Sequence, residues 1–177
     1  MWCAAALCLT GILVAPARAE VVDRILHVVG QRTVTASDLA FEADLDAHDP
    51  GPVAAFEDPS LPLEQRLVDC ALLREQAGDI DILKPSASEV QARWDRIRNT
   101  WTPPGEDLRF LARWGMREED FKGWLYSRMV VERFVLRSLA TATPAAYAEW
   151  MGPIRARGVI RSPAEPEGDS FPGAGRP

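Results

Sequence analysis

The chain has 177 residues, of which 47% are hydrophobic, and its formal net charge at pH 7 is −6. This length is typical of one domain, and the apolar fraction is large enough to build a core. An acidic chain is a poor ligand for the phosphates of DNA or RNA, so we expect no nucleic acid among its partners.

Residues 1–19 carry the features of a cleavable signal peptide. The segment from Trp2 to Val14 is an apolar run that is short for a membrane span, and Ala17-Arg18-Ala19 supplies a small-x-small cleavage site. No Lys or Arg precedes the run, which leaves open a misassigned start codon or an uncleaved anchor. We expect secretion across the inner membrane into the periplasm, with cleavage after Ala19.

The two ends of the mature chain are predicted to share a small sheet. Residues 21–30 mix β-branched and apolar side chains, Gly30-Gln31 supplies a turn, and residues 32–35 can pair back as a hairpin. Residues 158–161 have the pattern of a further strand. The segment 162–177 is rich in Pro, Gly and acids and is predicted to be a disordered tail.

Between these strands the apolar spacing is helical. Ser37 is expected to cap the first helix, the proline-rich residues 49–62 to form a loop, and Gly152-Pro153 to interrupt or end the last helix. The predicted fold is therefore mainly α, a helical domain over residues 20–161 with a small β-sheet made by the N-terminal hairpin and the C-terminal strand. The predicted helices lie at residues 37–48, 62–77, 86–101, 108–112, 121–139 and 143–152.

The two halves of the mature chain carry opposite charge. Residues 20–83 hold 14 acids and 4 arginines, whereas residues 84–162 hold 9 acids and 14 Lys or Arg. One interpretation is that two faces of one domain attract each other. The other is that the basic half makes weak contact with a membrane surface or with acidic clients.

We expect no catalytic residue, no metal and no cofactor. The only histidines are His27 and His48, and no Gly-rich phosphate loop, zinc spacing or nucleophile elbow occurs. Cleavage after Ala19 leaves Cys70 as the one cysteine, which excludes an internal disulfide. We interpret Cys70 as a small buried hydrophobe, with a reactive thiol as the alternative.

Five tryptophans follow Ala19, more than so small a core usually needs. Aromatic and Met side chains make adaptable surfaces for unfolded polypeptide, although core positions would show the same pattern. The candidate peptide-binding residues are Trp94, Ile97, Trp101, Leu111, Trp114, Phe121, Trp124, Leu125 and Met129.

Segments spread along residues 21–161 resemble, in the same order, parts of one known family. They are residues 22–38 (opening hairpin and first helix), 67–77 and 85–90 (second helix and entry to the third), 111–121 and 125–137 (signature and long helix) and 150–160 (returning helix and strand). The family is that of the SurA-type periplasmic chaperones, in the trigger factor/SurA peptide-binding group. In it, parvulin-type isomerase domains usually separate the long helix from the returning strand. Here only 38 residues follow Leu139, below the ~50 residues of the smallest domains.

The resemblance implies a chaperone core without the isomerase. We therefore expect an exported, ATP-independent holdase for unfolded or extended polypeptides, with outer-membrane protein precursors as the expected clients. One alternative is a dedicated assembly or accessory subunit that binds one envelope protein. A less favoured alternative is a peptidyl-prolyl isomerase. The sequence leaves the identity of the clients and the oligomeric state open.

Overall fold

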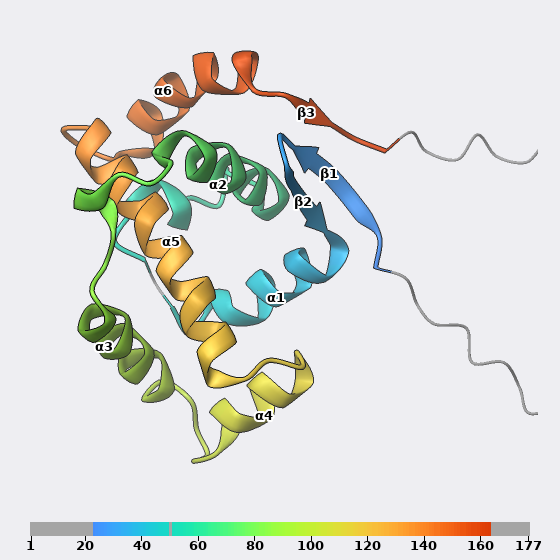
Figure 1. Cartoon of the computed structure of the whole chain (residues 1–177), viewed down its shortest axis with the longest axis vertical. Coiled ribbons are helices and arrows are strands. Elements are labelled where there is room, and N and C mark those ends of the chain that lie inside the picture. The colour runs from blue at the N-terminus through green and yellow to red at the C-terminus, as the bar shows by residue number, and fades with distance from the viewer. Residues whose placement is uncertain (1–22, 50, 164–177) are drawn as a thin grey trace, which may run out of the picture.

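The computed structural model describes residues 23–49 and 51–163 (Figure 1). The predicted signal peptide, and the predicted tail beyond Pro163, lie outside the described residues. Over the described part the chain is mainly helical, with a small antiparallel sheet that the two ends of the domain build together. The predicted fold class is confirmed.

The sheet has the strand order β2-β1-β3. Strand β1 (Ile25–Val29) pairs with β2 (Arg32–Thr35) as a hairpin, and Gly30 takes a φ of 56°, as the first central residue of a type II′ turn does. On its other side, β1 pairs with β3 (Ile160–Arg161) near the C-terminal end of the domain. The strand that returns from the far end of the chain therefore closes the sheet, as the sequence predicts.

The helices fill the chain between β2 and β3. Their bounds differ from the predicted ones by a few residues at most ends, as expected for positions where pattern alone sets the limit. Two short 3-10 turns, η1 (Ala54–Glu57) and η2 (Asp81–Leu83), lie in connections, the first of them inside the predicted proline-rich loop. The helices are α1 (Ala36–Asp46), α2 (Leu63–Ala77), α3 (Ala87–Arg98), α4 (Glu106–Arg113), α5 (Glu118–Ser138) and α6 (Pro144–Arg157).

The predicted cap of the first helix is wrong by two positions. Thr35, not Ser37, is the N-cap: the Thr35 N–H donates to the carboxylate of Asp38 at 2.9 Å, and the Asp38 N–H donates back to the Thr35 hydroxyl. Only Thr35 has an acid at the third helical position, so only Thr35 can form this reciprocal pair. Ser37 donates instead to Asp23, ahead of β1.

The predicted break at Gly152-Pro153 is also wrong, because α6 runs through Pro153 to Arg157. A proline inside a helix costs about 3 kcal/mol. Three buried residues on one face of the helix, Tyr147, Met151 and Ile154, pack into the core and offset this cost.

The core has two main clusters, and α5 contributes to both. The first joins the sheet, α2 and α6, and includes the fully buried Val29, Leu73 and Met151. The second joins α1, α3, α4 and the first half of α5, and includes the fully buried Trp94 and Phe121. In Figure 1, α5 crosses the molecule diagonally, with α3 on one side and α1 and α2 on the other. This explains why its apolar residues cover more than one face.

Candidate functional site

A pocket of about 210 Å³ opens between β2, α1, α2 and α5. In Figure 1, α1 follows directly on β2, and α2 and α5 lie near them. Pockets that hold small-molecule ligands or cofactors usually measure about 300–1,000 Å³, so this one is better matched to a side chain than to a whole ligand. The lining residues are Arg32, Thr33, Val34, Asp38, Phe41, Glu42, Phe56, Arg66, Leu67, Cys70, Ala71, Arg74, Trp124, Ser127, Arg128 and Val131.

Aromatic and aliphatic side chains form much of the wall. The rings of Phe41 and Trp124 meet edge to face, with centroids 5.2 Å apart, and join α1 to α5. Leu67 of α2 and Val131 of α5 also line the pocket. This wall gives an apolar side chain a surface to bury against.

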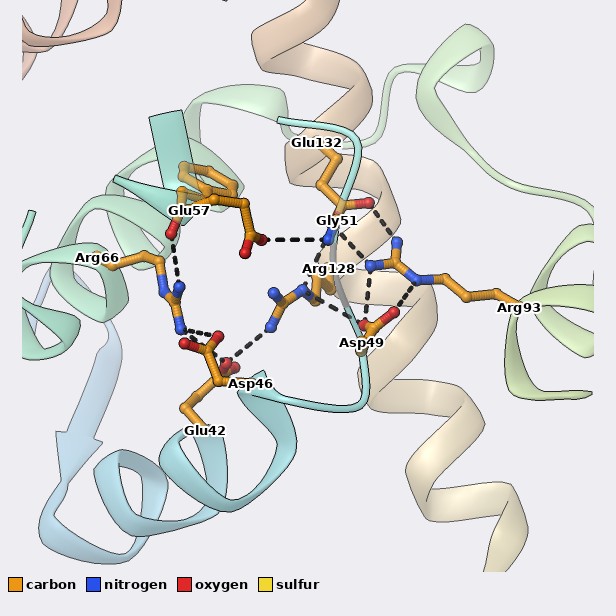
Figure 2. A network of polar contacts seen from close by, with 10 residues as sticks. Glu42, Asp46, Asp49, Gly51, Glu57, Arg66, Arg93, Arg128 and Glu132 are labelled. Atoms are coloured by element: carbon orange, nitrogen blue, oxygen red, sulfur yellow. Dashed lines mark hydrogen bonds and ion pairs between the residues drawn. The ribbon is translucent and has the colours of Figure 1, made fainter. Parts of the chain in front are cut away.

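Three charged residues of the wall, Glu42, Arg66 and Arg128, belong to a network of buried ion pairs (Figure 2). At one end, Arg66 of α2 donates to Asp46 at 2.5 Å and to the main-chain oxygen of Phe56 at 2.7 Å. Arg128 of α5 donates to Glu42 of α1 at 2.7 Å. Arg66 and Glu42 are almost fully buried. Charges this deep are tolerated only where each finds partners, so the network fixes α1, α2 and α5 relative to one another.

At the other end, Arg93 of α3 joins the same network. It donates to both carboxylate oxygens of Asp49, at 2.9 and 2.8 Å, and to Glu132 of α5. The Arg128 guanidinium lies 3.4 Å from Glu132 and 3.7 Å from Asp49. The pairing ties the loop after α1 to both α3 and α5.

The network also connects the two oppositely charged halves of the chain. Glu42 and Asp49 come from the acidic half, and Arg93 and Arg128 from the basic half. Outside the network, Arg155 of α6 pairs with the fully buried Asp69 of α2 at 2.5 Å. These contacts support the interpretation that the two halves attract each other within one domain.

The outer edge of β2 borders the pocket. Val29 and Arg32 flank the tight turn as a hydrogen-bonded pair, so the next pair, Val28 and Thr33, directs its main-chain groups away from each other. The main-chain groups of Val28 face β3. The main-chain N–H and C=O of Thr33 face outward. Within the described residues, no main-chain hydrogen bond from outside the hairpin reaches them. Thr33 is exposed and lines the pocket, so it offers an N–H and a C=O beside an apolar wall.

The structure places six of the nine candidate peptide-binding residues in the core. Each of the six is at most 7% exposed, and they pack in the cluster of α1, α3, α4 and α5, so peptide could reach them only if these helices moved apart. They are Trp94, Ile97, Trp101, Leu111, Phe121 and Leu125.

The other three candidates are partly buried at the border of this cluster. Trp124 lines the pocket. Met129 lines a separate hollow between α3 and α5, and Trp114 packs edge to face on Phe41. Only Trp124 thus lies at the site that the geometry favours. The sequence predicts the hairpin and a sheet edge as a place for extended peptide, but none of the nine candidate residues belongs to β2.

Cys70 lies in the pocket wall, and burial raises the pKa of its thiol to about 12. Because the thiolate is the reactive form, we expect iodoacetamide at about pH 8 to modify the native thiol at least ~100-fold more slowly than the thiol of the urea-unfolded chain. Mass spectrometry of timed samples measures both rates. Equal rates in the two states would favour the alternative, a reactive thiol.

His27 connects β1, α2 and the chain just after β3. Its Nε2 lies 2.6 Å from the carboxylate of Glu64 on α2, and its Nδ1 lies 3.0 Å from the hydroxyl of Ser162, just after β3. His27 lines neither the pocket beside β2 nor the hollow at Met129. The contacts stabilise the closure of the sheet by the returning chain.

The described residues hold neither a candidate metal site nor a membrane-spanning helix. Across residues 23–49 and 51–163, no three His, Cys, Asp or Glu residues gather in a way that could hold a metal ion. Nor does this part of the chain contain a helix of sufficient length and apolarity to cross a bilayer.

Comparison with protein-family models, with curated proteins and with solved structures finds no match. The fold and the site describe the chain in structural terms alone. It is a mainly helical domain with a small sheet built by both ends of the domain, and its pocket lies beside an open strand edge.

Proposed function

We propose that this chain is an exported, ATP-independent holdase that binds unfolded or extended polypeptide, with outer-membrane protein precursors as its clients. The observation that carries the proposal is the position of the pocket against the outward edge of β2. A strand edge offers main-chain partners to any sequence, and the adjacent wall offers apolar contact. Together they suit a protein that must hold many different chains.

In the proposed mode of binding, a client segment lies beside β2 as an added strand. The N–H and C=O of Thr33 hydrogen-bond with its main chain, and because strand side chains alternate, one of them enters the pocket against Phe41 and Trp124. Release needs no chemical step, since each of these contacts is weak and reversible.

We expect Thr33→Pro to weaken binding of a fluorescein-labelled, urea-unfolded porin by about 10-fold or more, measured by fluorescence anisotropy. Proline removes the outward N–H and adds a ring at the edge, while the N–H that it replaces takes no part in the pairing of β1 with β2.

The matched control is Thr33→Ala, which keeps the N–H and should bind within about 2-fold of the unaltered chain. Circular dichroism would establish that both variants are folded. Equal affinity of the folded Thr33→Pro variant would contradict the proposed strand addition. Binding of one envelope protein alone, with no affinity for unrelated unfolded chains, would favour the dedicated accessory subunit.

A further inference from the structure

Two arginines at one end of the pocket have no acidic partner within the described residues. Arg32 begins β2 and is exposed, and Arg74 lies in the last turn of α2. The Nη1 of Arg74 donates to the main-chain oxygen of Gly78 at 2.7 Å, and its Nε is buried without an acceptor. The other two arginines of the pocket, Arg66 and Arg128, are paired with acids.

The hairpin turn brings the two arginines to the same end. Gly30, which precedes Arg32 by two residues, lies against Glu75, the neighbour of Arg74: a Cβ on Gly30 would stand 2.0 Å from the Glu75 carboxylate. The turn therefore lies in close contact with the Glu75 side chain, beside the end of α2.

None of the acids near this end forms an ion pair with Arg32 or Arg74 within 4.0 Å. Asp38 accepts hydrogen bonds from Thr35 as part of the α1 cap. Glu42 pairs with Arg128. Glu75 is exposed and lies against the turn, and it makes no ion pair within 4.0 Å of Arg32 or Arg74. This end of the pocket therefore presents two guanidinium groups that no acid of the described residues pairs with.

We propose that Arg32 and Arg74 bind the free C-terminal carboxylate of the polypeptide that lies along β2. The inference rests on the proposed function and names the part of the client that the site recognises. Arginine is suited to this role because its planar guanidinium can donate two parallel hydrogen bonds to one carboxylate.

A chain end fits this position better than an acidic side chain does. Strand β2 has four residues and begins at Arg32, so an added strand reaches the arginines where its main-chain partners on β2 run out. The terminal carboxylate continues the line of the main chain, whereas a side chain of a strand points above or below the sheet. The site therefore favours the end of an extended chain over an internal segment.

The test uses the mature chain from Glu20 and three fluorescein-labelled peptides of one alternating apolar and polar sequence. The first ends in a free carboxylate, the second ends in an amide, and the third ends in an amide but carries an internal Asp. We expect the first to bind about 10-fold more tightly than the other two, measured by anisotropy at low salt. The preference should disappear in both Arg32→Gln and Arg74→Gln.

Glu75→Gln is the matched control, because it removes a charge at the same end and should keep or increase the preference for the carboxylate. Arg32 is exposed, so its variant tests the inference even if Arg74→Gln, which loses a contact to Gly78, fails to fold. Equal binding of the first two peptides would overturn the inference and leave the holdase proposal standing. Equal binding of the first and third peptides would also overturn the inference and leave the holdase proposal standing. No binding of any peptide or of unfolded porin would overturn both proposals.

Discussion

Replacing Trp94 with alanine is expected to lower the free energy of unfolding by about 3–5 kcal/mol, because the change leaves a large cavity in the second core cluster. Trp94 is fully buried, and its ring centroid lies 4.8 Å from that of Phe121 and 5.9 Å from that of Trp101. Urea unfolding followed by circular dichroism measures the loss.

Leu108→Ala is the control for this experiment. Leu108 belongs to the adjacent helix α4 but is 65% exposed, so its removal should change the free energy of unfolding by about 0.5 kcal/mol or less. A Trp94→Ala variant of unchanged stability that binds unfolded porin more weakly would contradict the assignment of Trp94 to the core. That result would instead support the prediction that Trp94 lines a peptide-binding groove.

Replacing Arg128 with methionine is expected to cost about 3–5 kcal/mol of stability, because it removes one partner from a buried charge network. Glu42 would lose the guanidinium that now lies 2.7 Å from its carboxylate, while remaining only 6% exposed. The double variant Arg128→Met, Glu42→Gln should recover part of the loss, because no unpaired carboxylate is then left beside the methionine. Urea unfolding of the single and double variants measures this recovery.

The cost of Arg128→Met should also depend on pH. Burial raises the pKa of Glu42 above its ordinary value of 4.5, although Arg128 and Arg66 act to lower it. A carboxyl with a higher pKa in the folded state holds its proton more tightly there, so protonation favours folding as the pH falls through the window above 4.5. Loss of Arg128 raises this pKa further. The stability gap between the variant and the unaltered chain should therefore be smaller at about pH 5 than at about pH 8. A gap that does not change with pH would show that Glu42 is not the group left uncompensated.

The sequence is informative about the fold because the signals are local. The hairpin turn at Gly30 and the strand pattern after Gly158 each depend on a few neighbouring residues, and each is present in the structure. Helix ends are harder to predict where two residues can both cap, as Thr35 and Ser37 can. Pro153 shows the opposite case, in which distant packing outweighs a local break signal.

The site is harder to predict, because it depends on which apolar faces meet. Trp94 and Trp124 both lie in amphipathic helices, yet one is fully buried and the other lines the pocket. The charged wall is harder still, since Glu42 and Arg128 are 86 positions apart. Acids and arginines inside apolar helical stripes are the signal that could have indicated it, because a buried charge needs a partner.

The holdase proposal is tested most directly by light scattering. Urea-unfolded porin is diluted into buffer with and without the chain from Glu20 onward, after circular dichroism has established that this chain is folded. The account predicts that aggregation is suppressed near a stoichiometric ratio of chain to porin, and that Thr33→Ala retains this effect while Thr33→Pro loses most of it. Undiminished scattering in the presence of the folded, unaltered chain would contradict the account.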